Sequence, residues 1–184
     1  DMAIWKDIDG SSGYAADRMR GAVRSKTDST NAEFASVGYT WDYQNGYFDS
    51  ATADSTIYAW MFKRAPGFFD VVCYEGDGTT TGITHNLTVI PEMYIIKRRD
   101  YADGQGWMVY HKDAIASGAA NAESSYLTLN ETSAVVSSTS RFGNVAPTIT
   151  TFGVSASSAN ESGSTYVAYL FASLDGVSKV FSVT

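Results

Sequence analysis

The sequence predicts an all-β protein that folds as an antiparallel β-sandwich. Short runs of aromatic and β-branched residues recur along its 184 residues, and Gly, Ser, Thr, Asn and Asp separate these runs. Residues 39–50 carry Asn45-Gly46 between aromatic flanks, and this dipeptide tolerates the positive φ of a tight hairpin turn. Only residues 13–26 look helix-like, with weak apolar spacing. The hydrophobic fraction of 44% can supply a core.

The predicted strands follow one another in chain order, each bounded by turn-forming residues. They are 56–62 (TIYAWMF), 68–74 (FFDVVCY), 92–99 (EMYIIKRR), 106–112 (GWMVYHK), 125–130 (SYLTLN), 165–171 (TYVAYLF) and 178–183 (SKVFSV). Their aromatic and β-branched side chains fit a pleated, half-buried surface. Gly76 and Gly78 interrupt residues 74–82, which predicts a hairpin or a wide loop there.

Two pairs of segments indicate an internal duplication. The segment STIYAWMF (55–62) matches STYVAYLF (164–171), 109 positions later, and the match continues into the next strand. Residues 2–9 match residues 93–100 at an offset of 91. The chain therefore divides into 1–67, the later part of a first repeat unit, and 68–184, a second unit. The first unit lacks the two front strands of the second. Either the units share one sandwich, or the first has open edges that another chain covers.

The second unit resembles a known family through a specific string of motifs. It contains FFDVVCYEGDGTTTGITHNLTVIPEMYIIKRRD (68–100), followed by WMVYHK, YLTLN, APT and GSTYVAYLFASLDGVSKV. This string is similar to a repeat domain of marine bacteriophage virion and tail-fibre proteins. The resemblance covers most of 68–184 and, more loosely, 1–67. It implies a concanavalin-like jelly-roll sandwich, a location in the virion and a role in attachment, and it supplies no catalytic residues.

Charge and composition exclude several classes of partner. The formal net charge of −7 argues against general nucleic-acid binding and against an anionic membrane surface. No apolar run is long enough for a transmembrane helix. The single cysteine, Cys73, lies in an apolar run and is read as an inert buried thiol. The chain begins with Asp1 rather than Met, which suggests a processed or excised piece of a longer polypeptide.

The residues do not favour an enzyme. Glu75 and Asp77 begin the Glu-x-Asp-x-x-Glu pattern of laminarinase-like glycosidases, but Thr80 stands where the third carboxylate is needed. His85 and His111 lack metal-ligand spacing, so packing or a loop-bracing role is expected for them. Isolated Asp residues have no specific Ca²⁺ spacing. We therefore predict a non-enzyme with no cofactor and no metal.

Glycan binding has two candidate sites. Sugar sites stack aromatic rings on pyranose faces and use polar side chains to bond the hydroxyl groups. The first candidate is the hairpin, with Trp41, Asp42, Tyr43, Asn45 and Tyr47, and the second is Tyr101 with Trp107. The alternative is that these aromatic residues cover the core or a subunit interface. Trp5 and Trp60 are expected in the core, because their repeat partners are Ile96 and Tyr169.

Two basic clusters have an ordinary structural explanation. Residues 97–99 (KRR) are read as a solvated strand end paired with local acids. Arg18, Arg20 and Arg24 are read as a second positive face that contacts an acidic neighbouring subunit.

The leading functional expectation is a non-enzymatic virion module of a tail fibre or other appendage. Its expected partners are other virion subunits, further copies of itself and a host-surface glycan. The alternatives are a capsid-decorating protein and a dedicated carbohydrate-binding lectin domain. Neither nucleic-acid binding nor membrane insertion is expected.

Overall fold

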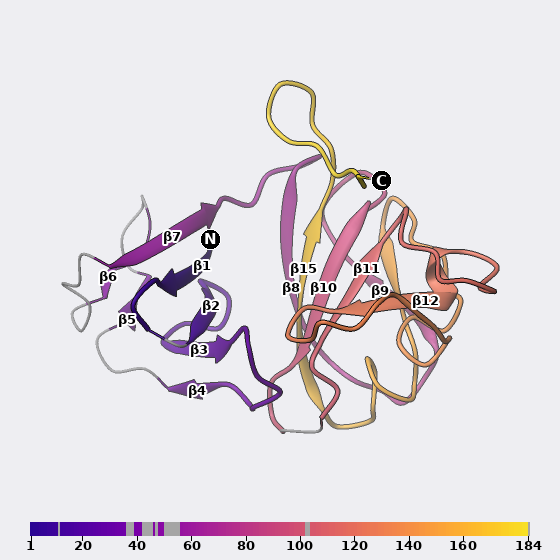
Figure 1. Ribbon diagram of the computed structural model, residues 1–184, viewed down its shortest axis with the longest axis horizontal. Helices are drawn as coiled ribbons and strands as arrows, with labels where there is room; N and C mark the ends of the chain where they lie inside the picture. The colour runs from indigo at the N-terminus through magenta and orange to yellow at the C-terminus, as the bar shows by residue number, and fades with distance from the viewer. Residues whose placement is uncertain are drawn as a thin grey trace.

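The computed structural model describes residues 1–10, 12–35, 39–41, 46, 48–49, 56–101 and 104–183. Nearly all of its regular structure is β, arranged in antiparallel sheets, and this confirms the predicted all-β sandwich class (Figure 1). One 3-10 turn, η1 (Ala122–Ser124), interrupts the strands. The described part of the chain contains no apolar helix of membrane-spanning length.

The first sheet is built from the N-terminal third of the chain. Its strands, in spatial order, are β4 (Phe34–Ala35), β3 (Val23–Lys26), β2 (Gly13–Asp17), β1 (Met2–Asp7) and β7 (Ile57–Phe62). The stretch 13–26 forms strands β2 and β3, so its helix-like reading was wrong. The Asp17 side chain accepts a hydrogen bond from the Arg20 backbone N–H, which stabilises the turn between the two strands.

The second sheet is larger and contains most of the predicted strands. Its order is β13 (Val136–Ser137), β12 (Ser125–Thr128), β11 (Trp107–His111), β10 (Met93–Arg98), β15 (Thr165–Phe171) and β8 (Phe69–Glu75). β9 (Thr81–Thr84) pairs separately with β14 (Thr151–Val154). The remaining predicted strand, 178–183, does not form in the described structure, where Ser178 makes only an isolated bridge to Leu174.

The predicted hairpin is reproduced only as an antiparallel pair of short strands. β5 (Tyr39–Thr40) pairs with β6 (Phe48–Asp49), with Thr40 opposite Phe48. A two-residue turn at Asn45-Gly46 would place Tyr43 opposite Phe48, so the observed register differs from the predicted one. The turn residues 42–45 lie outside the described residues.

The pairing registers of the two main sheets agree with the sequence offsets. β1 pairs with β7 through Met2 and Phe62, and β10 pairs with β15 through Met93 and Phe171. Met2 and Met93 are 91 positions apart, and Phe62 and Phe171 are 109 apart. The shared ancestry of the two units stays a prediction, but their strands occupy equivalent places.

Apolar side chains fill both sides of the second sheet. One face packs against the first sheet, where Phe62 meets Phe69 and Phe171 at ring-centroid distances of 5.4 and 5.5 Å. The other face packs under the loops that carry β9 and β14, with Tyr94 and Tyr110 stacked at 4.5 Å. Because both faces are covered, the second sheet is the central layer of the molecule (Figure 1).

The two tryptophans expected in the core differ in outcome. Trp5 is buried and packs near Trp41 on the outer face of the first sheet, so that prediction is confirmed. Trp60 is 58% exposed, so its assignment to the core was wrong. Its repeat partner Tyr169 is fully buried. The difference follows from topology, because Tyr169 lies on a strand with neighbours on both sides and Trp60 lies on the last strand of its sheet.

Buried tyrosines should make the free energy of unfolding fall at alkaline pH. Burial raises the pKa of Tyr94 and of Tyr169 well above the usual value of 10.0. The unfolded chain releases these protons near pH 10 while the folded chain retains them. Stability is therefore complete below about pH 10 and falls above it, by about 1.4 kcal/mol per pH unit for each tyrosine. Urea midpoints measured from neutral pH to about pH 11 should fall accordingly, with a shallower decline for Tyr94→Phe. An unchanged midpoint above pH 10 would contradict this.

Candidate interaction surface

The structure buries Trp107, which belongs to the second candidate site for glycan binding. Trp107 is 1% exposed, and its indole N–H donates a 2.8 Å hydrogen bond to the backbone carbonyl of Lys26 in the first sheet. Its ring is stacked with Tyr169, at a centroid distance of 6.4 Å and an interplanar angle of 15°. Trp107 therefore joins the two sheets, and its ring faces are not available to a sugar in this structure.

The other glycan candidates are divided. Trp41 is buried against the outer face of the first sheet, while Asp42, Tyr43, Asn45 and Tyr47 lie outside the described residues. Tyr101 is 60% exposed, and the guanidinium of Arg98 lies 5.4 Å from its ring centroid. The structure therefore does not bring Tyr101 and Trp107 together on one open surface, because one is exposed and the other is inside.

The basic run 97–99 is only partly the solvated strand end that was expected. Lys97 is fully buried, and its ammonium donates to the carbonyl oxygens of Thr30 and Arg98, at 3.1 and 2.7 Å. Arg99 forms a two-pronged ion pair with Glu33, at 3.0 and 2.9 Å. Lys97 and Arg99 thus connect the second sheet to the 30–33 segment of the first unit, so Lys97 was misread as solvated.

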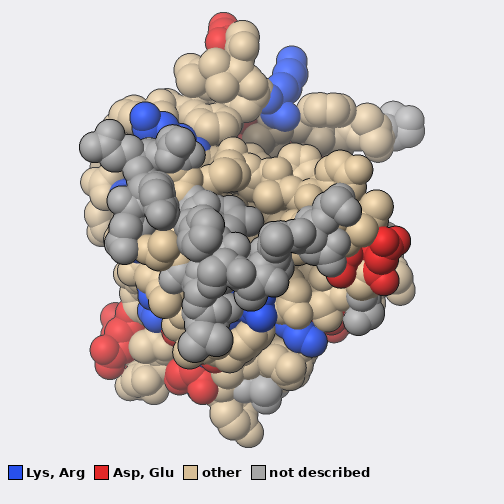
Figure 2. Space-filling view, turned by 90° about the vertical axis from the view of Figure 1, so that its left-hand side faces the viewer, with Lys and Arg blue, Asp and Glu red and all other residues tan. Residues whose placement is uncertain are grey.

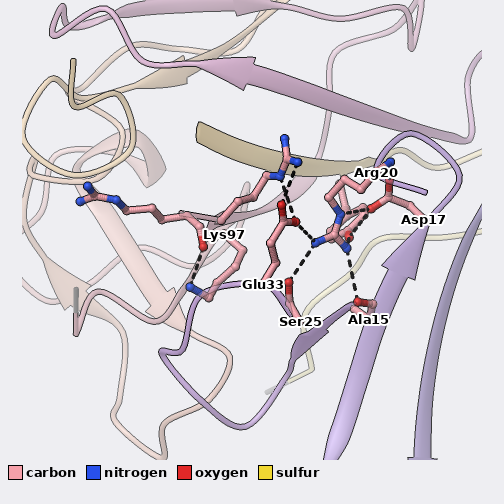
Figure 3. Close-up of polar contacts among 9 residues, drawn as sticks. Ala15, Asp17, Arg20, Ser25, Glu33 and Lys97 are labelled. Carbon is pink, nitrogen blue, oxygen red and sulfur yellow. Dashed lines mark hydrogen bonds and ion pairs between the residues drawn. The ribbon is translucent and has the colours of Figure 1, made fainter. Parts of the chain in front are cut away.

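Arg20 is the centre of a buried ionic network between the sheets (Figure 3). Its guanidinium donates to the Asp17 carboxylate at 2.6 Å, to the Tyr169 hydroxyl at 2.8 Å and to Glu33 at 3.1 Å. The side chains of Arg20 and Asp17 are both 0% exposed. The Tyr169 hydroxyl also donates to Asp17, at 2.8 Å. The expected positive face is therefore wrong for Arg20, since this residue joins the two sheets internally.

The network also determines the protonation of Arg20. Burial by itself would lower the pKa of Arg20, but Tyr169, Asp17 and Glu33 outweigh it and raise this pKa above its usual value. A buried, permanently charged arginine with paired acids fixes the geometry of an interface, because leaving either partner alone is costly. The position of the first sheet on the second is thus set by specific hydrogen bonds as well as by apolar packing.

Local contacts account for the polar residues considered for catalysis. Asp77 accepts hydrogen bonds from Thr79 and Asn160 in the loop after β8. His85 is buried and accepts a hydrogen bond from the Leu87 backbone N–H, consistent with bracing its loop. Burial raises the pKa of the Cys73 thiol, as an unreactive cysteine requires. Within the described ranges, no three His, Cys, Asp or Glu side chains gather as a metal site.

The outer edge of the second sheet is protected. Ala65 forms a two-way backbone bridge with Phe69 at the start of β8. The Asp70 carboxylate then accepts from the Val71 backbone N–H at 2.9 Å and is held by Arg64 at 2.7 Å. Proteins commonly blunt an edge strand in this way, with charges and local bridges that prevent another strand from pairing.

The β7 edge of the first sheet, in contrast, is exposed and uncharged. β7 pairs with β1 on one side, and no described residue pairs as a strand with its other side. Its large side chains Tyr58, Trp60 and Met61 are exposed, and the strand contains no charged residue, proline or glycine. Figure 2 views the molecule from the side of the first sheet, where the visible acidic and basic residues lie in separate small groups. An exposed apolar edge strand of this kind is a template for another strand.

An open edge was one of the two alternatives that the sequence left for the first unit, and its position was not predicted. The missing front strands of the first unit pointed to open edges, whereas the match between Trp60 and Tyr169 placed β7 in the core.

No solved structure and no curated protein matches the chain. A family model described as a domain of unknown function (DUF7483) matches residues 8–184, and this match runs through both sheets. The chain therefore belongs to the DUF7483 family.

Proposed function

We propose that the chain is a non-enzymatic structural module of a phage virion, part of a tail fibre or other appendage. The observation that carries the proposal is the open edge of β7, with Tyr58, Trp60 and Met61 exposed on an uncharged strand. Such an edge favours a protein that works against neighbouring subunits rather than alone. The resemblance of residues 68–184 to virion repeat domains supports the location.

The interior supports a rigid module. The Arg20 network and the Trp107–Lys26 hydrogen bond join the two sheets at separate points. In a module joined in this way the two sheets keep a fixed relative orientation, so neighbouring subunits bound to it are also held in fixed positions. Weak contacts to a host surface would be multiplied by copy number in such an assembly.

Labelling of virions tests the proposal. Antibodies raised against the chain should decorate the tail or an appendage of particles of the phage that encodes it, as seen by immunogold electron microscopy. Labelling spread over the head would instead support the capsid-decorating alternative. Protein found in infected cells but absent from purified particles would overturn a virion role.

Host-glycan attachment is the second candidate, and the exposed ring of Tyr101 is the observation that favours it. Binding of the protein to a glycan array, lost in Tyr101→Ala, would support it. Absence of binding by the unmodified protein would overturn it.

A further inference from the structure

The two main sheets correspond strand for strand, except at one position. β4, β3, β2, β1 and β7 occupy the places of β13, β12, β11, β10 and β15. The pairing registers of the inner strands also match. The second residue of β2, Tyr14, pairs with the last residue of β3, Lys26, and the second residue of β11, Met108, pairs with the last residue of β12, Thr128. The second sheet then continues beyond β15 with β8. The first sheet has no strand at the equivalent place beyond β7, as far as the described residues extend.

This vacant place explains the exposure of β7. The five central residues of β15, Tyr166–Leu170, are all buried between β10 and β8. The four central residues of β7, Tyr58–Met61, are all exposed. Equivalent strands in equivalent sheets thus differ because, among the described residues, only β15 has a second neighbouring strand. A strand added beside β7 would remove the difference.

The chain makes the same turn after β7 and after β15. The first turn contains the bridge between Ala65 and Phe69, and the second contains the bridge between Leu174 and Ser178, again 109 positions later. Gly67 and Gly176 both have φ of +74°, a left-handed conformation that glycine adopts without strain. After the first turn the chain continues as β8 and pairs with β15 of the other sheet. The second turn leads into residues 178–183.

Residues 178–183 are a strand-like segment that lacks a sheet. The sequence predicts a strand there, yet this segment pairs with no strand in the part of the chain that the structure describes. Phe181 is 61% exposed and Val183 is 85% exposed. The Val180 backbone N–H donates to the Ser173 hydroxyl, a local contact. In Figure 1 the yellow end of the chain lies near the upper ends of β15 and β10. Residues 178–181 line a groove there together with Phe171 of β15 and Phe62 at the end of β7.

We propose that residues 178–183 of one copy add as an antiparallel strand to the open edge of β7 in a second copy. The register transfers from β15 and β8, where Phe171 is opposite Phe69 and Tyr169 is opposite Val71. The equivalent residues are found 109 positions before β15, in β7, and 109 positions after β8, in residues 178–183. The transferred register therefore places Phe62 opposite Ser178 and Trp60 opposite Val180. Addition of a strand to an exposed edge draws affinity from the main-chain hydrogen bonds and specificity from alternate side chains.

The side chains of the two segments fit in this register. The large Phe181 lies opposite the small Ala59, with Met61 and Ile57 as its neighbours along β7. Val180 lies opposite Trp60 and covers part of its exposed ring. Directly opposite residues share a face of the sheet, so these pairs are in contact. β7 contains no charged residue, so the added strand buries no charge of the receiving strand.

Each copy has one donor segment, residues 178–183, and one acceptor edge, the free side of β7. Contacts of this heterologous kind build a head-to-tail chain, or a ring if the rotation closes. The inference deepens the structural role proposed above and rests on it for its biological purpose. It does not need the virion location, because the pairing depends only on residues of this chain.

Complementary variants test the inference in solution. Light-scattering mass of the full chain should rise above 19.9 kDa with increasing concentration. Phe181→Asp removes the donor and Trp60→Asp removes the acceptor, and each variant alone should stay at the monomer mass. A mixture of the two should form a species of twice that mass and nothing larger, because each variant keeps one half of the contact.

The controls separate this contact from other forms of association. Ile149 is exposed to a similar degree elsewhere, so Ile149→Asp should assemble like the unmodified chain. Since Trp60 and Phe181 are exposed in the single chain, their variants should keep its circular dichroism and urea midpoint. Self-association that survives Phe181→Asp would indicate pairing of β7 with β7 and would overturn the inference. A monomer at every concentration would overturn it as well.

Disulfide trapping tests the register directly. In a Cys73→Ser background, Tyr58→Cys and Ser182→Cys are opposite each other in the proposed register. Mixing these two single-cysteine proteins under oxidising conditions should give a covalent heterodimer. Replacing the second by Ser133→Cys, on an exposed loop, should not. Equal trapping with both would overturn the register. Labelled virions with a monomeric protein would refute strand donation alone, and assembly without virion labelling would refute the location alone.

Discussion

Arg20→Met is expected to lower the free energy of unfolding by about 3–5 kcal/mol. The substitution keeps most of the side-chain volume but removes the guanidinium that donates to Asp17, Glu33 and the Tyr169 hydroxyl. The Asp17 carboxyl group then remains buried without its cationic partner, with the Tyr169 hydroxyl and the backbone N–H of residue 20 as donors. An unpaired buried charge is what makes breaking such a pair costly. Urea unfolding followed by tryptophan fluorescence measures the change.

A second substitution and a surface control show whether burial is the cause. Arg20→Met combined with Asp17→Leu should lose less stability than the sum of the two single changes, because the double variant leaves no buried carboxylate at this point. The ion pair of Lys112 with Asp113 is exposed to solvent, so Lys112→Met should cost far less stability than Arg20→Met. Equal losses for Arg20→Met and Lys112→Met would contradict the role assigned to the network.

Trp107→Ala is expected to cost about 3–5 kcal/mol, comparable to the largest losses seen on truncating a buried aromatic residue. Trp107 packs between the sheets against Tyr169 and donates to the Lys26 carbonyl, so the truncation leaves a cavity and an unpaired acceptor. Trp107→Phe should lose less, because it keeps much of the packing and gives up the hydrogen bond. The midpoint of urea unfolding and its slope are the quantities to compare.

Tyr101→Ala is the matched control for a residue that the sequence grouped with Trp107. Its ring is exposed, so the stability should change by no more than about 0.5 kcal/mol. If Trp107→Ala left the urea midpoint unchanged, the residue would not be a contact between the sheets and its glycan role would reopen.

Several features of this protein were predictable from local sequence. The strands at 56–62, 92–99 and 165–171 have runs of aromatic and β-branched residues that suit only a pleated surface, and each appears within a residue or two of its predicted bounds. The strands β1, β2, β3, β9 and β14 were not predicted. In β2 (GYAAD) the pattern is ambiguous, and its pairing with β1 resolves it. Propensity is weak in such segments, and tertiary contacts decide them.

The candidate sites were less predictable, because exposure depends on neighbours distant in sequence. Tyr101 and Trp107 are close along the chain and similar in composition, yet one is open and the other is enclosed by the first sheet. Trp60 and Tyr169 are equivalent in sequence, yet in the described residues only Tyr169 lies on a strand with neighbours on both sides. Lys97 reads as a surface residue, and it is buried because two carbonyl oxygens accept from its ammonium.

By itself, the sequence determined the all-β class, the strands β7, β8, β10, β11, β12 and β15, and the two offsets that relate the sheets. These depend on side-chain pattern along one segment at a time, which the local chain contains in full. Only the tertiary structure decided which strand edge is open, which aromatic residues are buried and that Arg20 is internal. Each of these depends on which segments become neighbours. Residues 178–183 show the division most clearly, since their pattern specifies a strand and the folded chain provides no partner for it in the part that the structure describes.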